Sequence, residues 1–528
     1  MLMLKVFLSS TFLDLQDERG ELMKKISPAL DVVRMESFVP DGRKSQAVAI
    51  ENLRGSDAAV FLISPYYGLL LESGSCIVPD CKAKDCPRGG ISYTHCEYRF
   101  AVAENKPRMV YMVEPATRKP ELARRYADAE SLYDVLKKEI QAAEMAPEIH
   151  EINTDQFDRI TSGLAKNIIR WYEEGKIKIN DFYGRGKILR ELMQKIDSNE
   201  RVLVHGVGGI GKTTLIQVAL LLQAMQGKKI VAIGPSQSYL SGSGYSYFRS
   251  SDAVNRQVTQ QPETISLYDL AEAFKVPDDI LKAGKEELVK HLLAHLKERD
   301  HLTFIDDFHL AEPDVKELVQ QVDGGIILAG KEDLPHGRQR IELGGVIEEK
   351  RMDMVMGKAS RLDKPVDDNT IRKIAALSEG HPVVMEILIN NYQDVNYDDI
   401  KTALQSEKST EEEFLQRAVK SILSPGALET LQQIAIINPD LETNLDYHAL
   451  WNTFPEQNIK ELTRKSLLAK REGYSDRYRI TYQSVQQTIA SGCENDRGYN
   501  EMAAGYAGSI RRLPRPGRFP GRPDVPVR

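Results

Sequence analysis

The sequence lacks the long apolar runs and the strong charge excess that mark several classes of protein. None of its apolar runs approaches the ~18 residues of a membrane span, and its first residues lack the basic and then apolar order of a signal peptide. The net charge of −7 gives no positive excess that would favour nucleic acid through bulk electrostatics. We therefore expect a cytoplasmic protein with no membrane partner.

Cysteine is also scarce, with five in 528 residues, and four of the five lie between positions 76 and 96. In a reducing compartment such a cluster predicts a metal site or free thiols rather than disulfides. The candidate ligands are Cys76, Cys81, Cys86 and Cys96 with His95, because thiolates and imidazole suit tetrahedral Zn²⁺. Their spacing is unusual for a zinc knuckle, so a structural Zn²⁺ and plain thiols both stay open.

The strongest motif is a glycine-rich turn between an apolar strand at 202–204 and a helix predicted over 215–225. Its spacing, Gly-x-x-x-x-Gly-Lys-Thr, predicts a P-loop that binds ATP or ADP, with Lys212 on the phosphates and the Thr213 hydroxyl on Mg²⁺. Such a turn points backbone N–H groups at one anion, and the helix adds its positive end. A turn that binds nothing is the alternative. The predicted cofactor-binding residues of this loop are Gly206, Gly208, Gly209, Gly211, Lys212, Thr213 and Thr214.

A buried strand predicted at 302–305 ends in two carboxylates, Asp306 and Asp307. Asp306 is placed to hold Mg²⁺ through water, and Asp307 to polarise an attacking water. An acidic turn that caps the next helix is the alternative. Together with Lys212, these two residues are the predicted catalytic groups of the nucleotide site.

The first 115 residues alternate short apolar strands with helical segments. Strands are predicted at 4–8, 31–38, 58–63 and 108–113. The alternation predicts a small parallel α/β sheet, and ligands of such sheets lie beyond the carboxyl ends of the strands. The polar side chains expected at that edge are Ser9, Ser10, Ser64 and Tyr66.

Residues 6–15, 57–68 and 92–98 resemble an uncharacterised domain that is often fused to NACHT-type ATPases and is distantly similar to TIR domains. The resemblance implies a TIR-like or flavodoxin-like sheet. In enzymatic TIR relatives a Glu after the third strand serves cleavage of NAD⁺, and Glu97 falls at the matching place. A carboxylate there can orient ribose hydroxyls and stabilise an oxocarbenium-like transition state. The alternatives are a solvated helix residue or a structural partner for Arg99 or Lys106.

Three further segments resemble signal-transduction ATPases of the STAND class, which includes NACHT and NB-ARC proteins. The Phe-x-Gly-Arg segment ending at Arg185 resembles the motif that lies against the adenine. Strand 324–330 resembles the sensor strand, so Lys331 would face the γ-phosphate where the family usually has Arg. Gly380-His381-Pro382 resembles the Gly-x-Pro motif of the helical lid, where Pro382 would pack near the adenine. Taken alone, the segments are a turn, a surface lysine and a helix corner.

Residues 415–492 carry three helical stripes and a strand pair, which predict a winged helix. Such a module reads DNA or, in the STAND class, acts as an intramolecular brake. The helix predicted at 458–465 is only moderately basic, which favours the brake. The tail at 493–528 is rich in Arg, Pro and Gly and is expected to be disordered. No repeat array of about 20–50 residues is found, so we expect a short STAND protein or one that misses its sensor.

These patterns predict an α/β protein. The resemblance to STAND proteins implies that it acts as an ATP-binding, slowly hydrolysing switch, and the domain order suggests defence signalling. Its nucleotide state would control assembly into a homo-oligomer and an N-terminal effector or interaction domain, and an unknown protein or nucleic acid would be the trigger. A non-catalytic nucleotide-dependent scaffold and a DNA-binding regulator are the alternatives. The predicted domains are 1–115, TIR-like; 116–175, helical connector; 176–365, P-loop core; 366–414, lid; 415–492, winged helix; and 493–528, tail.

Overall fold

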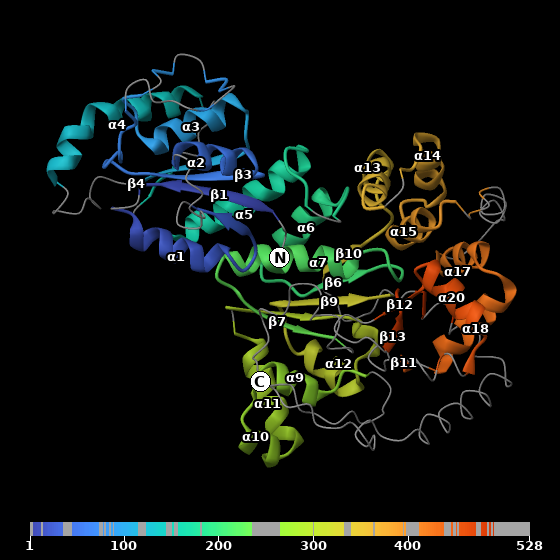
Figure 1. The fold of residues 1–528 in the computed structure, drawn as a ribbon. Coiled ribbons are helices and arrows are strands. Elements are labelled where there is room, and N and C mark those ends of the chain that lie inside the picture. Colours follow the sequence, from blue (N-terminus) through green and yellow to red (C-terminus); the bar gives the residue numbers. More distant parts are fainter. Residues whose placement is uncertain are drawn as a thin grey trace, which may run out of the picture. The chain divides into compact units, whose positions relative to one another are not determined.

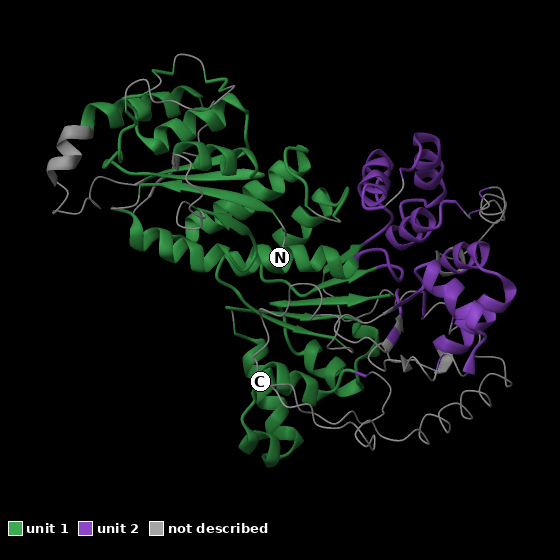
Figure 2. Cartoon of the chain, viewed as in Figure 1, with its two compact units in different colours: residues 1–205, 212–256, 265–342 green, residues 206–211, 257–264, 343–528 purple. Residues whose placement is uncertain are grey.

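The computed structural model describes residues 4–489 apart from several internal stretches. The chain splits into two compact units (Figure 2), one of residues 1–205, 212–256 and 265–342 and one of residues 206–211, 257–264 and 343–528. The residues outside the described part are 1–3, 12–13, 35–44, 73–77, 79–80, 84–85, 88, 114–122, 144–149, 153–156, 180–181, 235–263, 299, 332–338, 363–364, 394, 396, 398–410, 438–444, 447–449, 451–452, 471–476, 483–484, 487–488 and 490–528.

Five short parallel strands build the N-terminal sheet of the first unit. They are β1 (Lys5–Ser10), β2 (Asp31–Val33), β3 (Ala58–Ile63), β4 (Arg108–Val113) and β5 (His150–Ile152). Their order, β2-β1-β3-β4-β5, is the flavodoxin-like one. The first four strands begin close to the predicted positions. The fifth extends the sheet beyond residue 115, where the sequence places the end of this domain.

Helices cover both faces of this sheet (Figure 1). On one face lie α2 (Ser45–Arg54), α3 (Tyr93–Ala103) and α4 (Ala123–Ala143), and on the other α1 (Gln16–Ile26) and α5 (Phe157–Glu173). The first face packs around Phe61 and Tyr98, and Leu136 and Ile140 of α4 lie in the same core. The helix expected to connect two domains is therefore part of the N-terminal domain, because its apolar stripe is buried there.

A second five-stranded parallel sheet lies in the same unit. Its strands are β6 (Val202–His205), β7 (Lys229–Ile233), β8 (His301–Ile305), β9 (Ile326–Gly330) and β10 (Gln339–Glu342), in the order β10-β6-β9-β8-β7. Because every pairing is parallel, the carboxyl ends of β6, β8 and β9 meet at one edge. The predicted α/β fold with parallel sheets is confirmed.

The second sheet is also covered on both faces (Figure 1). The helices are α6 (Gly186–Asp197) and α7 (Lys212–Met225) on one face, and α9 (Leu267–Ala273), α11 (Lys285–Leu296) and α12 (Pro313–Gln320) on the other, with α10 (Asp278–Ala283) beside α11. Helix α5 contacts α1, α6 and α7, and α1 contacts α7. Ser162 Oγ of α5 donates to Gln226 Oε1 at 3.0 Å. The N-terminal domain thus packs on the helix that follows the glycine-rich turn.

The second unit is mostly helical. It holds α13 (Glu348–Ala359), α14 (Asp368–Leu377), α15 (Pro382–Asn390), α17 (Glu411–Ile422), α18 (Pro425–Ile437) and α20 (Glu456–Arg464). The strands β11 (Leu445–Asp446), β12 (Leu468–Lys470) and β13 (Arg477–Ile480) form an antiparallel sheet in the order β11-β13-β12. The predicted pair of helices around Gly380-His381-Pro382 is confirmed. The winged helix stays a prediction, and its turn at 471–476 and the tail at 493–528 lie outside the described residues.

No helix within the described ranges combines the length and the apolar character that crossing a membrane requires.

Candidate functional site

Glycines give the turn after β6 a backbone path that other residues rarely follow. Gly206, Gly209 and Gly211 have φ angles of 150, 78 and 103°. A Cβ at Gly206 would lie 2.5 Å from the carbonyl oxygen of Leu343, so only glycine fits there. Helix α7 begins at Lys212 directly after the turn, and its first N–H groups have no partner within the helix. The turn and the helix start therefore form a site suited to an anion.

The start of α7 meets the end of β8 through one hydroxyl. Thr213 Oγ1 donates to Asp306 Oδ2 at 2.9 Å, and the Asp307 N–H donates to Asp306 Oδ1 at 3.0 Å. Lys212 is buried, which lowers the pKa of its ammonium, whereas the charges of Asp307 and Asp306 act to raise it. The structure thus brings together the side chains predicted to hold phosphate and Mg²⁺. Their ligand roles stay a prediction.

The two carboxylates at the end of β8 have different surroundings. Burial raises the pKa of Asp306, and the neighbouring charge of Asp307 raises it further. A buried carboxylate of this kind is stabilised when a cation arrives. Asp307 lies in the left-handed region with φ 46° and makes no capping bond to the 3-10 helix η5 (Phe308–Leu310) that follows. The geometry therefore does not favour an acidic helix cap.

Lys331 directly follows β9 and is half-buried. Its positive charge contributes to the lowered pKa of Lys212. Two ammonium groups consequently act on the same edge of the sheet, where an anionic ligand would relieve their repulsion. This placement fits a phosphate-facing lysine better than a surface lysine remote from the site.

Arg185 lies at the N-cap of α6 and is buried, with 5% of its surface exposed. Burial lowers the pKa of its guanidinium to about 10. Tyr172 of α5 holds this turn, because its hydroxyl donates to the Phe182 carbonyl at 2.8 Å and the two rings lie 5.2 Å apart. Tyr172 carries no signal in the sequence, since a tyrosine in an amphipathic helix belongs to no motif.

Within the second unit, His381 at the start of α15 contacts the glycine-rich turn. His381 is the N-cap of α15, where Pro382 is the first helical residue, and its Nδ1 accepts from the Val384 N–H at 3.4 Å. Nε2 of His381 lies 3.0 Å from the Gly208 carbonyl oxygen. A carbonyl oxygen only accepts, so Nε2 carries the proton and donates. Sequence reasoning named the triplet but assigned no role to this histidine.

The N-terminal sheet has its own buried carboxylate. Ser9 Oγ at the end of β1 donates to Glu97 Oε2 of α3 at 2.5 Å, while Glu97 Oε1 has no hydrogen-bond partner among the described residues. Burial raises the pKa of Glu97 to about 7, although the Ser9 hydroxyl and the charge of Arg19 lower it. Glu97 is 4% exposed, so it is not a solvated helix residue.

The structural partners suggested for Glu97 lie elsewhere. Arg99 donates to Glu139 of α4, with an Nε to Oε2 distance of 2.9 Å. Lys106 Nζ donates to the Arg54 carbonyl at 3.1 Å. The sequence did not indicate Arg19, whose charge lowers the pKa of Glu97. Its Nη1 donates to Ser10 Oγ at 2.7 Å, at the end of the same strand.

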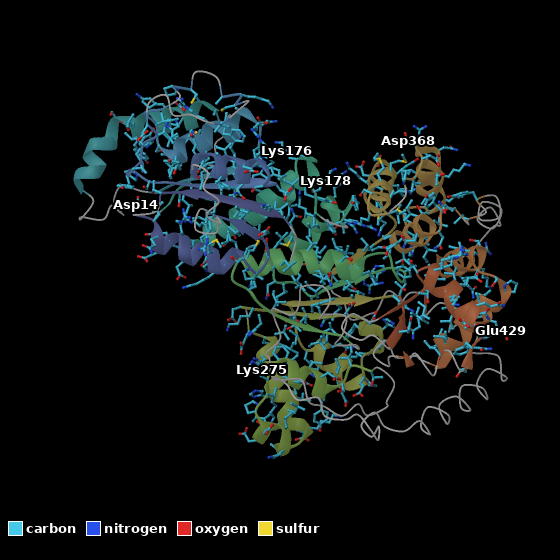
Figure 3. The ribbon with its side chains drawn as sticks, in the orientation of Figure 1. Asp14, Lys176, Lys178, Lys275, Asp368 and Glu429 are labelled. Carbon is cyan, nitrogen blue, oxygen red and sulfur yellow. The ribbon has the colours of Figure 1, made fainter. Side chains whose placement is uncertain are left out.

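A second polar cluster lies at the same edge of the N-terminal sheet. Thr11 Oγ1 donates to Asp14 Oδ1 at 2.5 Å, and Ser64 Oγ donates to Asp14 Oδ2. Asp14, labelled in Figure 3, lies on the connection between β1 and α1. Ser9, Ser10 and Ser64 therefore lie at the predicted edge, and their hydroxyls are all engaged in hydrogen bonds.

The cysteine cluster is only partly described. Cys81 and Cys86 are free and half-buried, Cys96 is buried, and Cys76 lies outside the described residues. Both ring nitrogens of His95 are within hydrogen-bond distance of other side chains: Tyr67 OH lies 2.6 Å from Nδ1, and Glu139 Oε2 lies 2.8 Å from Nε2. Its nitrogens thus have protein partners already. The proposed zinc ligand set stays a prediction.

Two family models match the chain. Residues 5–161 match a "Domain of unknown function (DUF4062)", which spans the complete N-terminal sheet with α4 and β5. Residues 182–275 match "Novel STAND NTPase 6", which begins at the Phe182–Arg185 turn and includes the glycine-rich turn. No curated protein matches the chain. The second match supports a P-loop ATPase core of the STAND type.

Several solved structures are similar at low sequence identity. A STAND protein with a tetratricopeptide repeat sensor from Pyrococcus horikoshii is 15% identical with a TM-score of 0.36, over 64% of this chain and 46% of that chain. Cdc6p from Pyrobaculum aerophilum is 14% identical with a TM-score of 0.29, over 58% of this chain and 94% of that one. RuvB from Thermotoga maritima, a Holliday junction branch migration motor, is 16% identical with a TM-score of 0.26, over 58% and 95%. The chain thus spans less than half of the STAND protein.

Proposed function

We propose that the chain is a nucleotide-dependent switch that binds ATP and hydrolyses it slowly. The observation that carries this proposal is the Thr213–Asp306 hydrogen bond beside buried Lys212, at the end of a glycine-rich turn. Lys212 would hold the β- and γ-phosphates, and the N–H groups of the turn would surround them. Lys331 would add a positive charge near the γ-phosphate, which ATP has and ADP lacks.

Thr213 and Asp306 fit a Mg²⁺ ion. They are two oxygen donors 2.9 Å apart, and one of them is a buried carboxylate whose pKa is raised by burial and by the charge of Asp307. When bound, the metal would neutralise charge that develops on the phosphates. Asp307 would orient the attacking water and accept its proton. The left-handed backbone at Asp307 turns the chain sharply after the strand, so that the two neighbouring carboxylates take different roles.

The lid would make this nucleotide site a switch. His381 at the start of α15 donates a hydrogen bond to the Gly208 carbonyl. A change in the backbone of the turn would therefore alter the position of the lid. We infer that ADP favours this contact and that ATP with the trigger favours its loss, because a switch requires different affinities for its two states. In the open state the chain would self-associate and bring N-terminal domains together for signalling, with defence as the biological setting.

The contact between α7, α5 and α1 supports an output through the N-terminal domain. Helix α7 carries Lys212 at its start, and it packs on α5 and α1. Helix α1 follows the strand end that holds Ser9 and Ser10. A shift of α7 with the nucleotide state would therefore reach the polar edge of the N-terminal sheet through packed helices.

The test of the nucleotide site is ATP binding by the full chain. Lys212→Ala is expected to weaken ATP binding by at least about tenfold, since it removes a charge-assisted contact. Lys187→Ala, an exposed lysine of α6, is the matched control and should bind as the wild type does. Equal ATP affinity of wild type and Lys212→Ala would refute the site. Particle mass with ADP and with a non-hydrolysable ATP analogue tests the switch, and equal masses would contradict self-association.

NAD⁺ cleavage by the N-terminal domain is a second candidate function. The observation that favours it is Glu97 Oε1, which is buried and has no hydrogen-bond partner among the described residues. This oxygen could accept a hydrogen bond from a ribose hydroxyl of NAD⁺ once the edge of the N-terminal sheet opens. NAD⁺ loss should occur in the activated wild type and stop in Glu97→Gln. If Glu97→Gln consumes NAD⁺ at the wild-type rate, Glu97 is not the catalytic carboxylate, and if the activated wild type consumes none, the domain is an interaction module.

We propose the brake role for residues 415–492 over DNA binding, because the charges of α20 are balanced and partly paired. Lys460 Nζ lies 2.6 Å from Glu456 Oε1, and Glu461 accepts from the Ser424 N–H and hydroxyl, each at 2.8 Å. Such a helix offers little net attraction to phosphates. A salt-dependent shift of duplex DNA by the full chain would favour the regulator instead.

A further inference from the structure

Three histidines and two carboxylates gather where α11 ends and β8 begins, outside the nucleotide site. His291 and His295 lie one turn apart on α11, Glu298 and Asp300 follow on the connection to β8, and His301 is the first residue of β8. The same strand ends at Ile305, directly before Asp306. The cluster and the nucleotide carboxylates thus lie at opposite ends of one strand, and no role in nucleotide binding accounts for the histidines.

The innermost group of this cluster is His301 with the two carboxylates. Nδ1 of His301 lies 2.6 Å from Glu298 Oε2 and 3.4 Å from Asp300 Oδ1. One ligand atom from each of these residues falls within 4.8 Å of the other two. Nδ1 is shielded from solvent and makes no hydrogen bond among the described residues, although a carboxylate oxygen is so close. The imidazole nitrogen and the two carboxylates therefore lie close enough together to contact one cation.

Further side chains contact the two carboxylates, Asp300 and Glu298, and hold their orientation. Lys229 Nζ lies 2.8 Å from Asp300 Oδ2, which turns the other oxygen of Asp300 toward His301. His295 Nδ1 lies 3.0 Å from Glu298 Oε1, and His295 Nε2 lies 3.2 Å from His291 Nε2. Such outer contacts orient ligands in metal sites.

An aromatic ring packs against the same histidines. Phe274, which directly precedes Lys275 (labelled in Figure 3), stacks on His295 with ring centroids 5.7 Å apart. Its centroid lies 6.4 Å from that of His301, with the rings nearly perpendicular. The apolar ring limits the orientations open to both imidazoles, which favours a preformed site.

We propose that Glu298, Asp300 and His301 bind a divalent transition metal of the zinc class. One imidazole with two carboxylates is a donor set that suits Zn²⁺, whereas Ca²⁺ and Mg²⁺ take oxygen alone. Water would complete the coordination, since Glu298 and Asp300 are exposed. The metal would join the end of α11 to the start of β8.

The experiment is a Zn²⁺ titration of the nucleotide-free full chain by calorimetry, with excess Mg²⁺ to occupy the nucleotide site. All proteins carry Cys76, Cys81, Cys86 and Cys493 changed to Ser and Cys96 changed to Ala, so that thiols do not contribute. One equivalent of Zn²⁺ is expected to bind, and His301→Ala should weaken binding by about 100-fold or more. His291 contacts His295 rather than a ligand, so His291→Ala should weaken binding by less than the roughly 10- to 100-fold that loss of a direct outer contact costs.

Two results would overturn the proposal. One is the absence of Zn²⁺ binding tighter than about 100 μM in the background protein, since preformed sites bind far more tightly. The other is a loss on His291→Ala that His301→Ala does not cause, which would place the metal between the two helix histidines. ATP affinity and circular dichroism confirm that each variant is folded. Zn²⁺ should also raise the melting temperature of the background protein but not of His301→Ala.

Discussion

The two parallel sheets of the first unit each place a buried carboxylate near the end of a strand. In the N-terminal sheet it is Glu97, which binds the hydroxyl of Ser9 at the end of β1. In the second sheet it is Asp306, which follows β8 and binds the hydroxyl of Thr213. In both, burial is the largest cause that raises the pKa of the carboxyl group. In both sites, therefore, a buried carboxylate accepts a hydrogen bond from a hydroxyl group.

The surroundings of these carboxylates differ, and that difference separates their functions. Asp306 has a second carboxylate beside it and the ammonium of Lys212 nearby, after a glycine-rich turn whose N–H groups suit an anion. The charge that acts on Glu97 is that of Arg19, which lowers the pKa of the carboxyl group. The same sheet architecture thus supports a phosphate site in one place and a closed polar cluster in the other, because function lies in the site and not in the fold.

The largest effect should come from matched carboxylate-to-amide changes in the two sheets. Asp306→Asn is expected to lower ATP turnover by about 100-fold or more, since about 2.7 kcal/mol of charge stabilisation at the metal would be lost. Glu97→Gln removes an equally buried charge from the other sheet and should leave turnover unchanged. Steady-state phosphate release by both full-length variants measures the difference.

The control for that comparison is ATP affinity. Asp306→Asn should still bind ATP without Mg²⁺, because Lys212 and the turn are intact. Equal slowing of turnover by Asp306→Asn and Glu97→Gln would show that the two edges work as one site.

A second test uses pH to sharpen the role of Glu97. The folded pKa of about 7 lies above the ordinary value of 4.5, so the folded domain binds a proton more tightly than the unfolded chain. This contribution to stability is fully present below pH 4.5 and is lost as pH rises through about 7. Its size is at most about 3 kcal/mol. Glu97→Gln has no such group, so wild type should lose stability relative to the variant over that range.

Hydrogen exchange of the Phe7 and Leu8 amides in β1 measures this change within the N-terminal domain. Wild type and variant are compared at each pH, which cancels the pH dependence of chemical exchange. Glu51→Gln, at an exposed position of α2, is the matched control and should follow the wild type. A constant difference between wild type and Glu97→Gln across the range would mean that Glu97 stays charged in the fold.

The parts of the site that sequence could predict are those that rest on local spacing. The glycine-rich turn, the strand that ends at Asp306 and the corner at Pro382 each depend on neighbours within a few residues, and the structure has all three. Parallel strand order then brings Asp306 and Lys331 to the edge that holds Lys212, which follows from the predicted fold class.

The parts that could not be predicted depend on contacts between distant segments. Arg19 reaches Ser10 from α1, and Tyr172 reaches Phe182 from α5, but neither carries a local signal. The apolar stripe of α4 looks the same in the sequence whether it packs on the N-terminal sheet or on a partner, so the sequence does not show that Leu136 and Ile140 join the core of that sheet. His291 and His295 share a helix face, but their relation to His301 depends on how the chain returns to the sheet.

The smallest expected effect concerns the contact between His381 and the carbonyl oxygen of Gly208 in the glycine-rich turn. His381→Asn keeps a side chain that can cap α15 but is too short to donate to the Gly208 carbonyl as the imidazole does. Loss of one hydrogen bond of about 1 kcal/mol should speed ADP release by about three- to tenfold, with little change in fold. Stopped-flow displacement of a fluorescent ADP analogue gives the rate.

His381→Ala is the variant that separates the two bonds of this histidine, because it removes the cap to Val384 together with the contact to Gly208. If both variants release ADP faster to the same extent, the Gly208 contact controls release. If only His381→Ala is faster, the effect belongs to the start of α15, and the lid would not sense the turn through this bond. In neither variant should hydrogen exchange of β1 change while ADP is bound, since the Glu97 edge has no part in holding the lid.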